Sequence, residues 1–227
     1  MNKSILIATP GRCGSHWLMD ILTELLELKA IETKMFDPCD FENNISTAHN
    51  LSAIKATMED PFCTKFEHIS GRLESFKLNV IILVRDPRDI CVSIAHYTEK
   101  RHNGNFDNDF KRYLKEGSHN AVFFNAYKSE HETLRHYLIK FEKAILHPHD
   151  VISGMLNYFG YKYDSEKLDF YINKYNFNYL QKKDAIHYRK GVVGDWKNYM
   201  TEEQNKEYCE KHADLMELLG YDSAFIY

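Results

Sequence analysis

The residues of this sequence with the clearest chemical potential follow a short apolar run near its start. Ile5 to Ala8 predicts a buried strand, and apolar residues recur at helical spacing from Leu18 to Leu26. Between these two stretches lies the loop Pro10-Gly11-Arg12-Cys13-Gly14-Ser15-His16-Trp17. The backbone N–H groups of such a loop and the positive end of the helix dipole converge on one point, which suits an anion. Arg12 adds a permanent cation with a fork of donors.

This loop predicts an anion site of phosphate size, and the alternative interpretation is an ordinary strand-to-helix turn. It is P-loop-like without being the common triphosphate loop. The triphosphate pattern ends in Gly-Lys-Ser/Thr, whereas the triplet here is Gly14-Ser15-His16.

A second cation stands at the end of the clearest strand. Asn79 to Val84 is a β-branched run without alternation, which is typical of a strand covered on both faces, and Arg85 follows it directly. Ser93 comes eight residues later, in the helix expected after the strand, so Arg85 and Ser93 could hold one phosphate between them. The alternative is a surface ion pair of Arg85 with Asp86 or Asp89, which would contribute little to stability.

A third cationic segment lies near the end of the chain. Arg189 and Lys190 are adjacent and are followed by Gly191, which lets the backbone come close to a ligand. The dense run of glycine, tryptophan and charge up to Asn198 predicts an anion-binding loop. A plain basic surface loop is the alternative.

Strands alternate with helices along the chain, which predicts one three-layer α/β domain over residues 1–227, with a central parallel sheet and helices on both faces. The polar stretch Arg101–Gly117 predicts an exposed loop or lid. In such sheets ligands bind beyond the carboxyl ends of the strands. The other expected elements are strands at Phe62–His68 and His136–Phe141 and helices at Asn120–Arg135, Pro148–Phe159, Asp164–Lys174 and Thr201–Leu219.

The composition is that of an ordinary globular protein, with 44% hydrophobic and 27% charged residues. The net charge of −4 argues against a general nucleic-acid binder. The five cysteines are scattered and form no CxxC pair, so we expect neither a metal site nor a disulfide framework, and a reducing compartment fits best. No apolar run is long enough to span a bilayer and no signal peptide is expected, which predicts a cytoplasmic location.

The three cationic segments together carry a resemblance to a known family. Pro10–Leu18 resembles the 5′-phosphosulfate loop of sulfotransferases that use 3′-phosphoadenosine 5′-phosphosulfate (PAPS), and Val84–Ser93 resembles their 3′-phosphate segment. Arg189–Asn198 reproduces without a gap their Arg-Lys-Gly-x-x-Gly-Asp-Trp-Lys-Asn segment. The resemblance implies an enzyme that moves a sulfuryl group from PAPS, in line and without a metal, to a hydroxyl or amine of a small-molecule or glycan acceptor.

The resemblance also implies a set of cofactor-binding residues. The 5′-phosphosulfate would be held by Arg12, Cys13, Gly14, Ser15 and His16. Adenine would lie against Trp17, Phe141 and Phe177, and the 3′-phosphate would be held by Arg85, Ser93, Arg189, Lys190 and Gly191. Cations facing the oxygen that leaves with the nucleotide stabilise its growing charge, which makes Arg12, aided by Ser93, the catalytic candidate. Arginine stays protonated, so Arg12 is not a general acid.

The family further implies a histidine base at the end of a strand, and the sequence offers two candidates. His68 ends the run Lys65-Phe66-Glu67-His68 and stands 17 residues before Arg85, close to the family's layout. His49, in Ser46-Thr47-Ala48-His49, has a similar local pattern but lies further upstream. A histidine pKa near neutrality suits a base, and the spacing favours His68 with His49 as the alternative.

Two other functions stay open, a P-loop-type nucleotide kinase and a nucleotide-binding module without catalysis. The acceptor cannot be read from the sequence. A set of aromatic residues indicates either an aromatic-lined acceptor pocket or simply core: Tyr97, Tyr113, Phe123, Phe124 and Tyr127.

Overall fold

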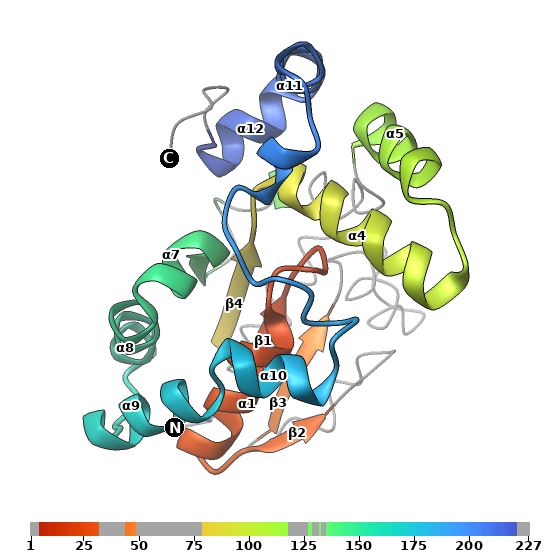
Figure 1. The fold of residues 1–227 in the computed structure, drawn as a ribbon. Helices are drawn as coiled ribbons and strands as arrows, with labels where there is room; N and C mark the ends of the chain where they lie inside the picture. Colours follow the sequence, from red (N-terminus) through yellow and green to blue (C-terminus); the bar gives the residue numbers. More distant parts are fainter. Residues whose placement is uncertain are drawn as a thin grey trace, which may run out of the picture.

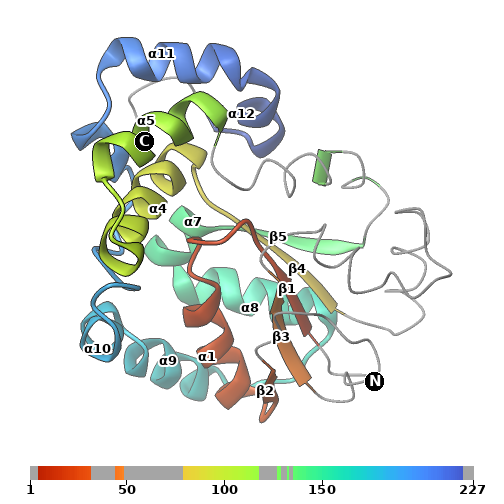
Figure 2. The ribbon, with the colours of Figure 1, turned by 90° about the vertical axis from the view of Figure 1, so that its right-hand side faces the viewer.

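The computed structural model describes residues 5–31, 44–48, 79–117, 127–128, 132 and 135–221, with the backbone alone for 29–31 and 44–48. Within these residues five strands form one parallel sheet in the order β2-β3-β1-β4-β5 (Figures 1 and 2). The strands are β1 (Ile5–Ala8), β2 (Lys29–Ile31), β3 (Asn44–Ala48), β4 (Asn79–Val84) and β5 (His136–Lys140).

The two central strands are buried along their length. Every side chain of β1 is inaccessible to solvent, and in β4 only the first residue, Asn79, is partly exposed. Such strands need apolar side chains on both faces, which explains the continuous apolar runs in place of an alternating pattern. β1 pairs with β3 on one side and with β4 on the other, so the chain segments that leave these three strands start from neighbouring positions.

Helices α1 (Ser15–Leu25), α8 (Pro148–Phe159) and α9 (Ser165–Lys174) form a row along the sheet (Figure 2). α1 packs against β3 and α9, α9 against α8, and α8 against β5. Amphipathic spacing buries Leu18, Ile21 and Leu22 of α1 in this contact. The short helices α7 (Phe141–Leu146) and α10 (Phe177–Lys183) continue the row toward the carboxyl ends of the strands.

The predicted α/β class, with a parallel sheet flanked by helices, is confirmed. β4 and α8 have the predicted bounds, and Gly160 ends α8 in the left-handed conformation at φ 75°. β5 ends one residue earlier than predicted, because Phe141 begins α7. The predicted elements Phe62–His68 and most of Asn120–Arg135 lie outside the described residues.

The prediction of a loop or lid at Arg101–Gly117 is wrong. Helix α4 runs from Pro87 to His102, and α5 (Phe106–Glu116) packs against it after a short connection. The polar composition masked an amphipathic pattern in which Phe106, Phe110 and Tyr113 share one face at helical spacing. Asn105 caps α5 by accepting a hydrogen bond from the Asn108 N–H at 3.0 Å.

The final predicted helix is divided in two. α11 (Glu202–Lys211) and α12 (Ala213–Leu219) are separated at His212, and a capping box formed by Thr201 and Gln204 begins α11. Before them, residues 184–194 have no regular helix or strand and lead into the 3₁₀ helix η2 (Asp195–Asn198). This 184–194 segment runs past the carboxyl ends of the strands (Figure 1).

Candidate functional site

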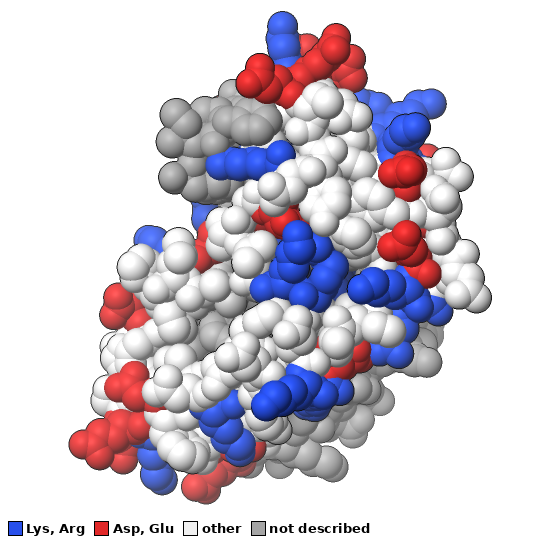
Figure 3. All heavy atoms as spheres, in the orientation of Figure 1, with Lys and Arg blue, Asp and Glu red and all other residues white. Residues whose placement is uncertain are grey.

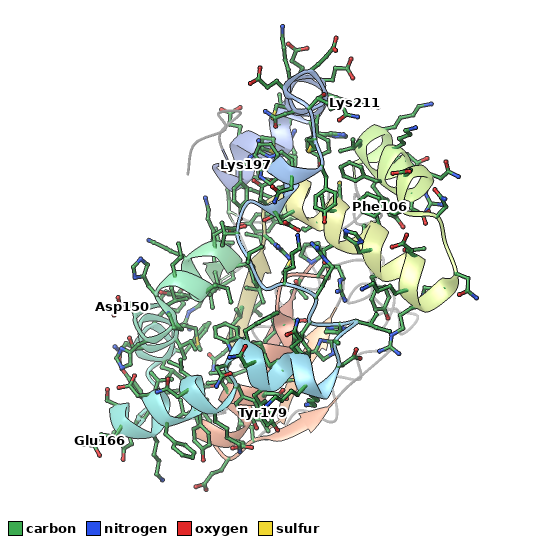
Figure 4. All side chains as sticks on the ribbon, viewed as in Figure 1. Phe106, Asp150, Glu166, Tyr179, Lys197 and Lys211 are labelled. Atoms are coloured by element: carbon green, nitrogen blue, oxygen red, sulfur yellow. The ribbon has the colours of Figure 1, made fainter. Side chains whose placement is uncertain are left out.

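A cavity of about 320 Å³ lies beyond the carboxyl end of the sheet. Its lining comes from the loop after β1, α1, the residue after β4, α4, α7, α8, the stretch from α9 to α10 and the 184–194 segment. Figure 4 draws the side chains on the ribbon of these elements. Four of the lining residues are cations, namely Arg12, Arg85, Arg189 and Lys190, and no described lining residue is an Asp or Glu. A cavity with this lining favours an anionic ligand.

The loop after β1 has the backbone of an anion site. Gly11 and Gly14 have φ values of 84°, and Arg12 between them has φ 57°, a left-handed conformation that non-glycine residues rarely adopt. Helix α1 begins at Ser15, and its N-cap residue is Gly14, which has no side chain to cap the first turn. The backbone N–H groups of that turn and the helix dipole favour negative charge at this point.

The Arg12 guanidinium is held by neutral acceptors from two distant parts of the chain. Its Nε donates to Ser93 Oγ at 3.2 Å, Nη2 donates to the backbone carbonyl of His187 at 2.9 Å, and Nη1 lies 3.3 Å from His187 Nδ1. The guanidinium also lies 4.6 Å from the centre of the Tyr97 ring, within cation–π range.

Arg12 has no carboxylate partner among the described residues. Burial, aided by the positive charges of Arg85 and Arg189, lowers the pKa of Arg12 to about 10, so the group stays charged at neutral pH. A partly buried cation without a counter-ion is costly, and a bound anion would remove that cost.

Arg85 lies beside this loop and fastens it to the 184–194 segment. Its Nη1 donates to the Arg12 carbonyl at 3.2 Å, its Nη2 donates to the Val192 carbonyl at 3.0 Å, and Asp89 lies 3.4 Å from Nη2. The ring centre of Phe141 is 4.4 Å from the guanidinium. The buried Nε has no hydrogen-bond partner among the described atoms, so Arg85 keeps one donor for a ligand.

The two arginines of the segment after β4 have different roles. Arg88 is buried, donates to both carboxylate oxygens of Asp86 at 3.0 and 2.7 Å and stacks 4.0 Å over the Trp196 ring. Asp89 accepts the backbone N–H groups of Gly194 and Trp196, each at 2.9 Å. Arg88 and Asp89 therefore hold the end of the 184–194 segment in place, and Arg85 alone of the three faces the cavity.

Arg189 and Lys190 share one carboxylate. Arg189 forms an ion pair with Asp195, Lys190 donates to the same carboxylate at 2.9 Å, and both cations approach the Tyr199 hydroxyl at 3.4 and 3.5 Å. Burial by itself raises the pKa of Asp195, but hydrogen bonds from Lys190, Arg189 and Asn198 lower it to about 2. On the face shown in Figure 3, Lys and Arg side chains gather over the segment between α10 and η2.

The rest of the cavity wall is apolar and aromatic. Trp17 comes from α1, Phe141 from α7 and Phe177 from α10, and Gly14 and Gly191 allow two of these rings to come close. A Cβ on Gly14 would lie 3.0 Å from the Phe141 ring, and one on Gly191 would lie 2.4 Å from the Phe177 ring. Flat apolar faces beside a cationic cluster suit a ligand with both an aromatic ring and anionic groups.

Most of the site residues predicted from the sequence line this one cavity. They are Arg12, Gly14, His16, Trp17, Arg85, Ser93, Phe141, Phe177, Arg189, Lys190 and Gly191. The side chains of Cys13 and Ser15 are buried and are not part of the lining. Cys13 Sγ donates to the Gly11 carbonyl at 3.1 Å, so these two residues can contribute to the lining only through their backbone.

The candidate base His68 and its alternative His49 lie outside the described residues, as do Phe123 and Phe124. Of the other suggested acceptor-pocket aromatics, Tyr113 and Tyr127 are buried in the hydrophobic core. Tyr97 is partly buried and lies against Arg12. Among the described residues of this aromatic set, Tyr97 is the one that contacts a cation of the cavity lining.

Sequence reasoning missed His187, which lines the cavity and supplies two acceptors to Arg12. No local signal marks it, because its contacts depend on a loop 175 positions away. Lining residues on α7, α8 and α9 were also missed, and their helical periodicity alone does not separate cavity from core: Ile145, Pro148, Ile172, Asn173 and Tyr175.

Comparisons with known proteins agree with this geometry. A family model described as "Sulfotransferase domain" matches residues 2–220. The chain is 23% identical to a 3-beta-hydroxysteroid sulfotransferase of Cavia porcellus, over 93% of this chain and 84% of that protein, and 21% identical to sulfotransferase 6B1 of Homo sapiens, over 95% and 77%.

Solved structures have the same fold. The crystal structure of mouse sulfotransferase SULT7A1 complexed with PAP matches with a TM-score of 0.72 at 18% identity, covering 96% of this chain and 85% of that one. Retinol dehydratase in complex with androsterone and PAP matches with a TM-score of 0.61 at 16% identity, covering 94% and 80%. Within the described residues no helix is both long and apolar enough to cross a membrane.

Proposed function

The chain belongs to the sulfotransferase family, and we propose that it transfers a sulfuryl group from PAPS to a hydroxyl or amine of an acceptor. The observation that carries this proposal is the Arg12 guanidinium, which lies in the cavity without a carboxylate partner among the described residues. We also propose a cytoplasmic location, because the described cysteines Cys13, Cys91 and Cys209 are buried thiols, which suits a reducing compartment.

The described residues suit the three groups of PAPS, which are the 5′-phosphosulfate, the 3′-phosphate and the adenine ring. Arg12 and the first turn of α1 suit the 5′-phosphosulfate, because Arg12 has no carboxylate partner among the described residues and the first turn of α1 contains no acidic residue. The unpartnered Nε of Arg85, with Arg189 and Lys190 nearby in the lining, suits the 3′-phosphate. The aromatic wall then suits adenine.

When bound, PAPS supplies an activated sulfuryl group attached to its 5′-phosphate through a bridging oxygen. Arg12 stabilises negative charge that develops in the cavity, because its guanidinium is already oriented by Ser93 and His187 before the charge appears. The Phe141 ring supports the Arg85 guanidinium from one side. The aromatic wall excludes water, which strengthens the interaction of these cations with an anion.

We propose that a histidine near the carboxyl end of β3 removes the proton from the acceptor. β3 ends at Ala48, the register partner of Ala8, and Ala8 is the last residue of β1 before the anion-binding loop. The next residue in the sequence after Ala48 is His49. The position of β3 therefore favours His49 over His68 as the base.

Tyr97 supports placing the acceptor on the far side of Arg12 from the nucleotide. Its ring packs against the Arg12 guanidinium, but Tyr97 is not among the residues that line the cavity. In-line transfer needs donor and acceptor on opposite sides of sulfur, so an acceptor that lies over Tyr97 would have the required direction.

The proposed function is tested by thermal-shift titrations with adenosine 3′,5′-bisphosphate (PAP), adenosine 5′-monophosphate and ATP with magnesium. We expect PAP to raise the melting temperature most, because a ligand of the folded state stabilises it. The Arg85→Met variant should lose the preference for PAP over the monophosphate. A shift with ATP and magnesium alone would indicate a kinase, and PAP binding without sulfuryl transfer from PAPS to any acceptor tried would indicate a binding module.

The Gly191→Ala variant is expected to weaken PAP binding about tenfold and to lower the melting temperature. Its new Cβ would overlap the Phe177 ring, and the left-handed φ of 63° costs a non-glycine residue about 1 kcal/mol. Gly160→Ala is the matched control, because Gly160 has φ 75° and does not line the cavity. Calorimetric titration should show normal PAP affinity for the control; an equal loss in both variants would contradict the assignment of Phe177.

A further inference from the structure

His187 supplies two of the three hydrogen-bond acceptors that Arg12 has among the described residues. Its carbonyl oxygen accepts from Nη2 at 2.9 Å, and its ring Nδ1 lies 3.3 Å from Nη1. The third acceptor is Ser93 Oγ, to which Nε donates at 3.2 Å. An arginine has five N–H groups, so these contacts leave two for an anion and fix the plane of the guanidinium.

The turn that carries His187 is itself closed by hydrogen bonds. One carboxylate oxygen of Asp184 accepts the backbone N–H groups of Ile186 and His187 at 3.0 and 2.9 Å, and the Tyr188 N–H donates to the Asp184 carbonyl at 2.9 Å. The other carboxylate oxygen forms an ion pair with Arg101 at the end of α4. His187 therefore reaches Arg12 from a turn that is fastened to α4.

Chemistry determines the protonation state of the His187 ring. Arg12 can only donate, so Nδ1 must accept and the single ring proton must be on Nε2. Burial, with Arg12 and His16 next in importance, lowers the pKa of His187 to about 4, and the imidazole is neutral at pH 7. Among the described residues, the titratable and charged groups that face it are Arg12, His16 of α1, Tyr97 and Arg101 of α4, and Asp184 and Tyr188 of its own turn.

We propose that His187 is a positioning residue that orients the Arg12 guanidinium for sulfuryl transfer, an inference that rests on the function proposed above. It acts through Arg12 and is not a proton donor. A neutral imidazole that gave up its Nε2 proton would become an imidazolate, which is far too basic to form near pH 7. The role suits an arginine in particular, because two nitrogens of its rigid planar fork each donate to one of these acceptors and so fix the plane of the group, whereas an ammonium group has no plane to orient.

The first test compares His187→Phe with His187→Asn. Phenylalanine keeps an aromatic ring beside His16 but removes the acceptor, and asparagine can place an amide oxygen near the Nδ1 position. We expect kcat to fall about 10- to 100-fold in the phenylalanine variant, which is the size expected for a hydrogen bond to a charged group, and to recover in the asparagine variant. The affinity for PAP should change less than kcat, because PAP lacks the sulfuryl group.

A double-mutant cycle with Arg12→Lys separates positioning from general structural damage. If His187 acts through the guanidinium, the phenylalanine substitution should lower kcat in the Arg12→Lys background by no more than roughly twofold, the scatter of uncoupled sites. Equal losses in both backgrounds would overturn the proposal.

A third measurement needs no activity. The pKa of His187 is below the ordinary 6.5 in the folded protein, so its contribution to stability is present above pH 6.5 and is lost as pH falls toward about 4. Between pH 7 and pH 4.5 the melting temperature should therefore fall less in His187→Phe than in the wild type. His96 and His212, whose pKa values burial also lowers, are present in both proteins and cancel.

These outcomes separate the inference from the function on which it rests. A wild-type protein that binds no PAP and transfers no sulfuryl group would overturn the proposed function. A wild type that does both, with a His187→Phe variant that matches it in kcat and in the pH dependence of melting, would overturn the role of His187 alone.

Discussion

Replacement of Arg12 by methionine is expected to abolish sulfuryl transfer and yet leave the ligand-free protein at least as stable as the wild type. The guanidinium is the cation best placed to stabilise charge in the cavity, and removing such a group lowers kcat by about a thousandfold. Methionine keeps an unbranched side chain of similar length. It also removes a partly buried charge that has no carboxylate partner among the described residues, and the free-energy cost of burying that charge is removed with it.

This expectation is checked by single-turnover kinetics with PAPS and by thermal melting without ligand. Arg112→Met is the matched control, because Arg112 is half-exposed on α5 and pairs with Asp109 far from the cavity lining. The control should have normal kcat. A variant at position 12 that keeps normal kcat, or that unfolds when the control does not, would show that Arg12 is a structural residue.

The second large effect on kcat is expected for the histidine that acts as general base toward the acceptor. His49→Ala should lower kcat by about 10²- to 10⁴-fold, the range typical of general base catalysis, while His68→Ala should keep nearly normal kcat. The reason is the register of the sheet, in which β3 ends at Ala48 beside the last residue of β1. His49 is the next residue in the sequence after Ala48, and the anion-binding loop follows Ala8, the register partner of Ala48.

The two histidine variants serve as controls for each other. Both should bind PAP with normal affinity in calorimetric titrations, because neither is proposed to touch the nucleotide. The acidic limb of the kcat/KM profile should disappear in His49→Ala and persist in His68→Ala. The reverse pattern would return the role to His68, and two active variants would exclude a histidine base at either position.

The pairing of the other charges explains why Arg12 has the largest expected effect. Arg85 forms an ion pair with Asp89 and Arg88 forms one with Asp86. Arg189 and Lys190 both form ion pairs with Asp195. Each of these cations supports the 184–194 segment or the start of α4 as well as the cavity. Arg12 alone among these cations meets only neutral partners within the described residues, so its charge is available to a ligand.

The sequence by itself determined the elements whose signal is local. The apolar runs of β1 and β4 and the spacing of α8 reproduce their bounds closely, because burial on both faces or along one stripe selects residues at short intervals. The three cationic segments were also recognisable, since glycines and cations at fixed offsets are needed to bring a backbone close to an anion. Local composition misled where a polar surface concealed an apolar face, as in α5.

Only the tertiary structure decided how those segments meet. It separated Arg85, which faces the cavity, from Arg88, which stacks on the Trp196 ring, although only two residues separate them in the sequence. It brought His187 to Arg12 across 175 positions of sequence, and it put the end of β3 next to the loop that follows β1. Such contacts depend on strand order and on the path of the 184–194 segment, and no periodicity within a single element encodes them.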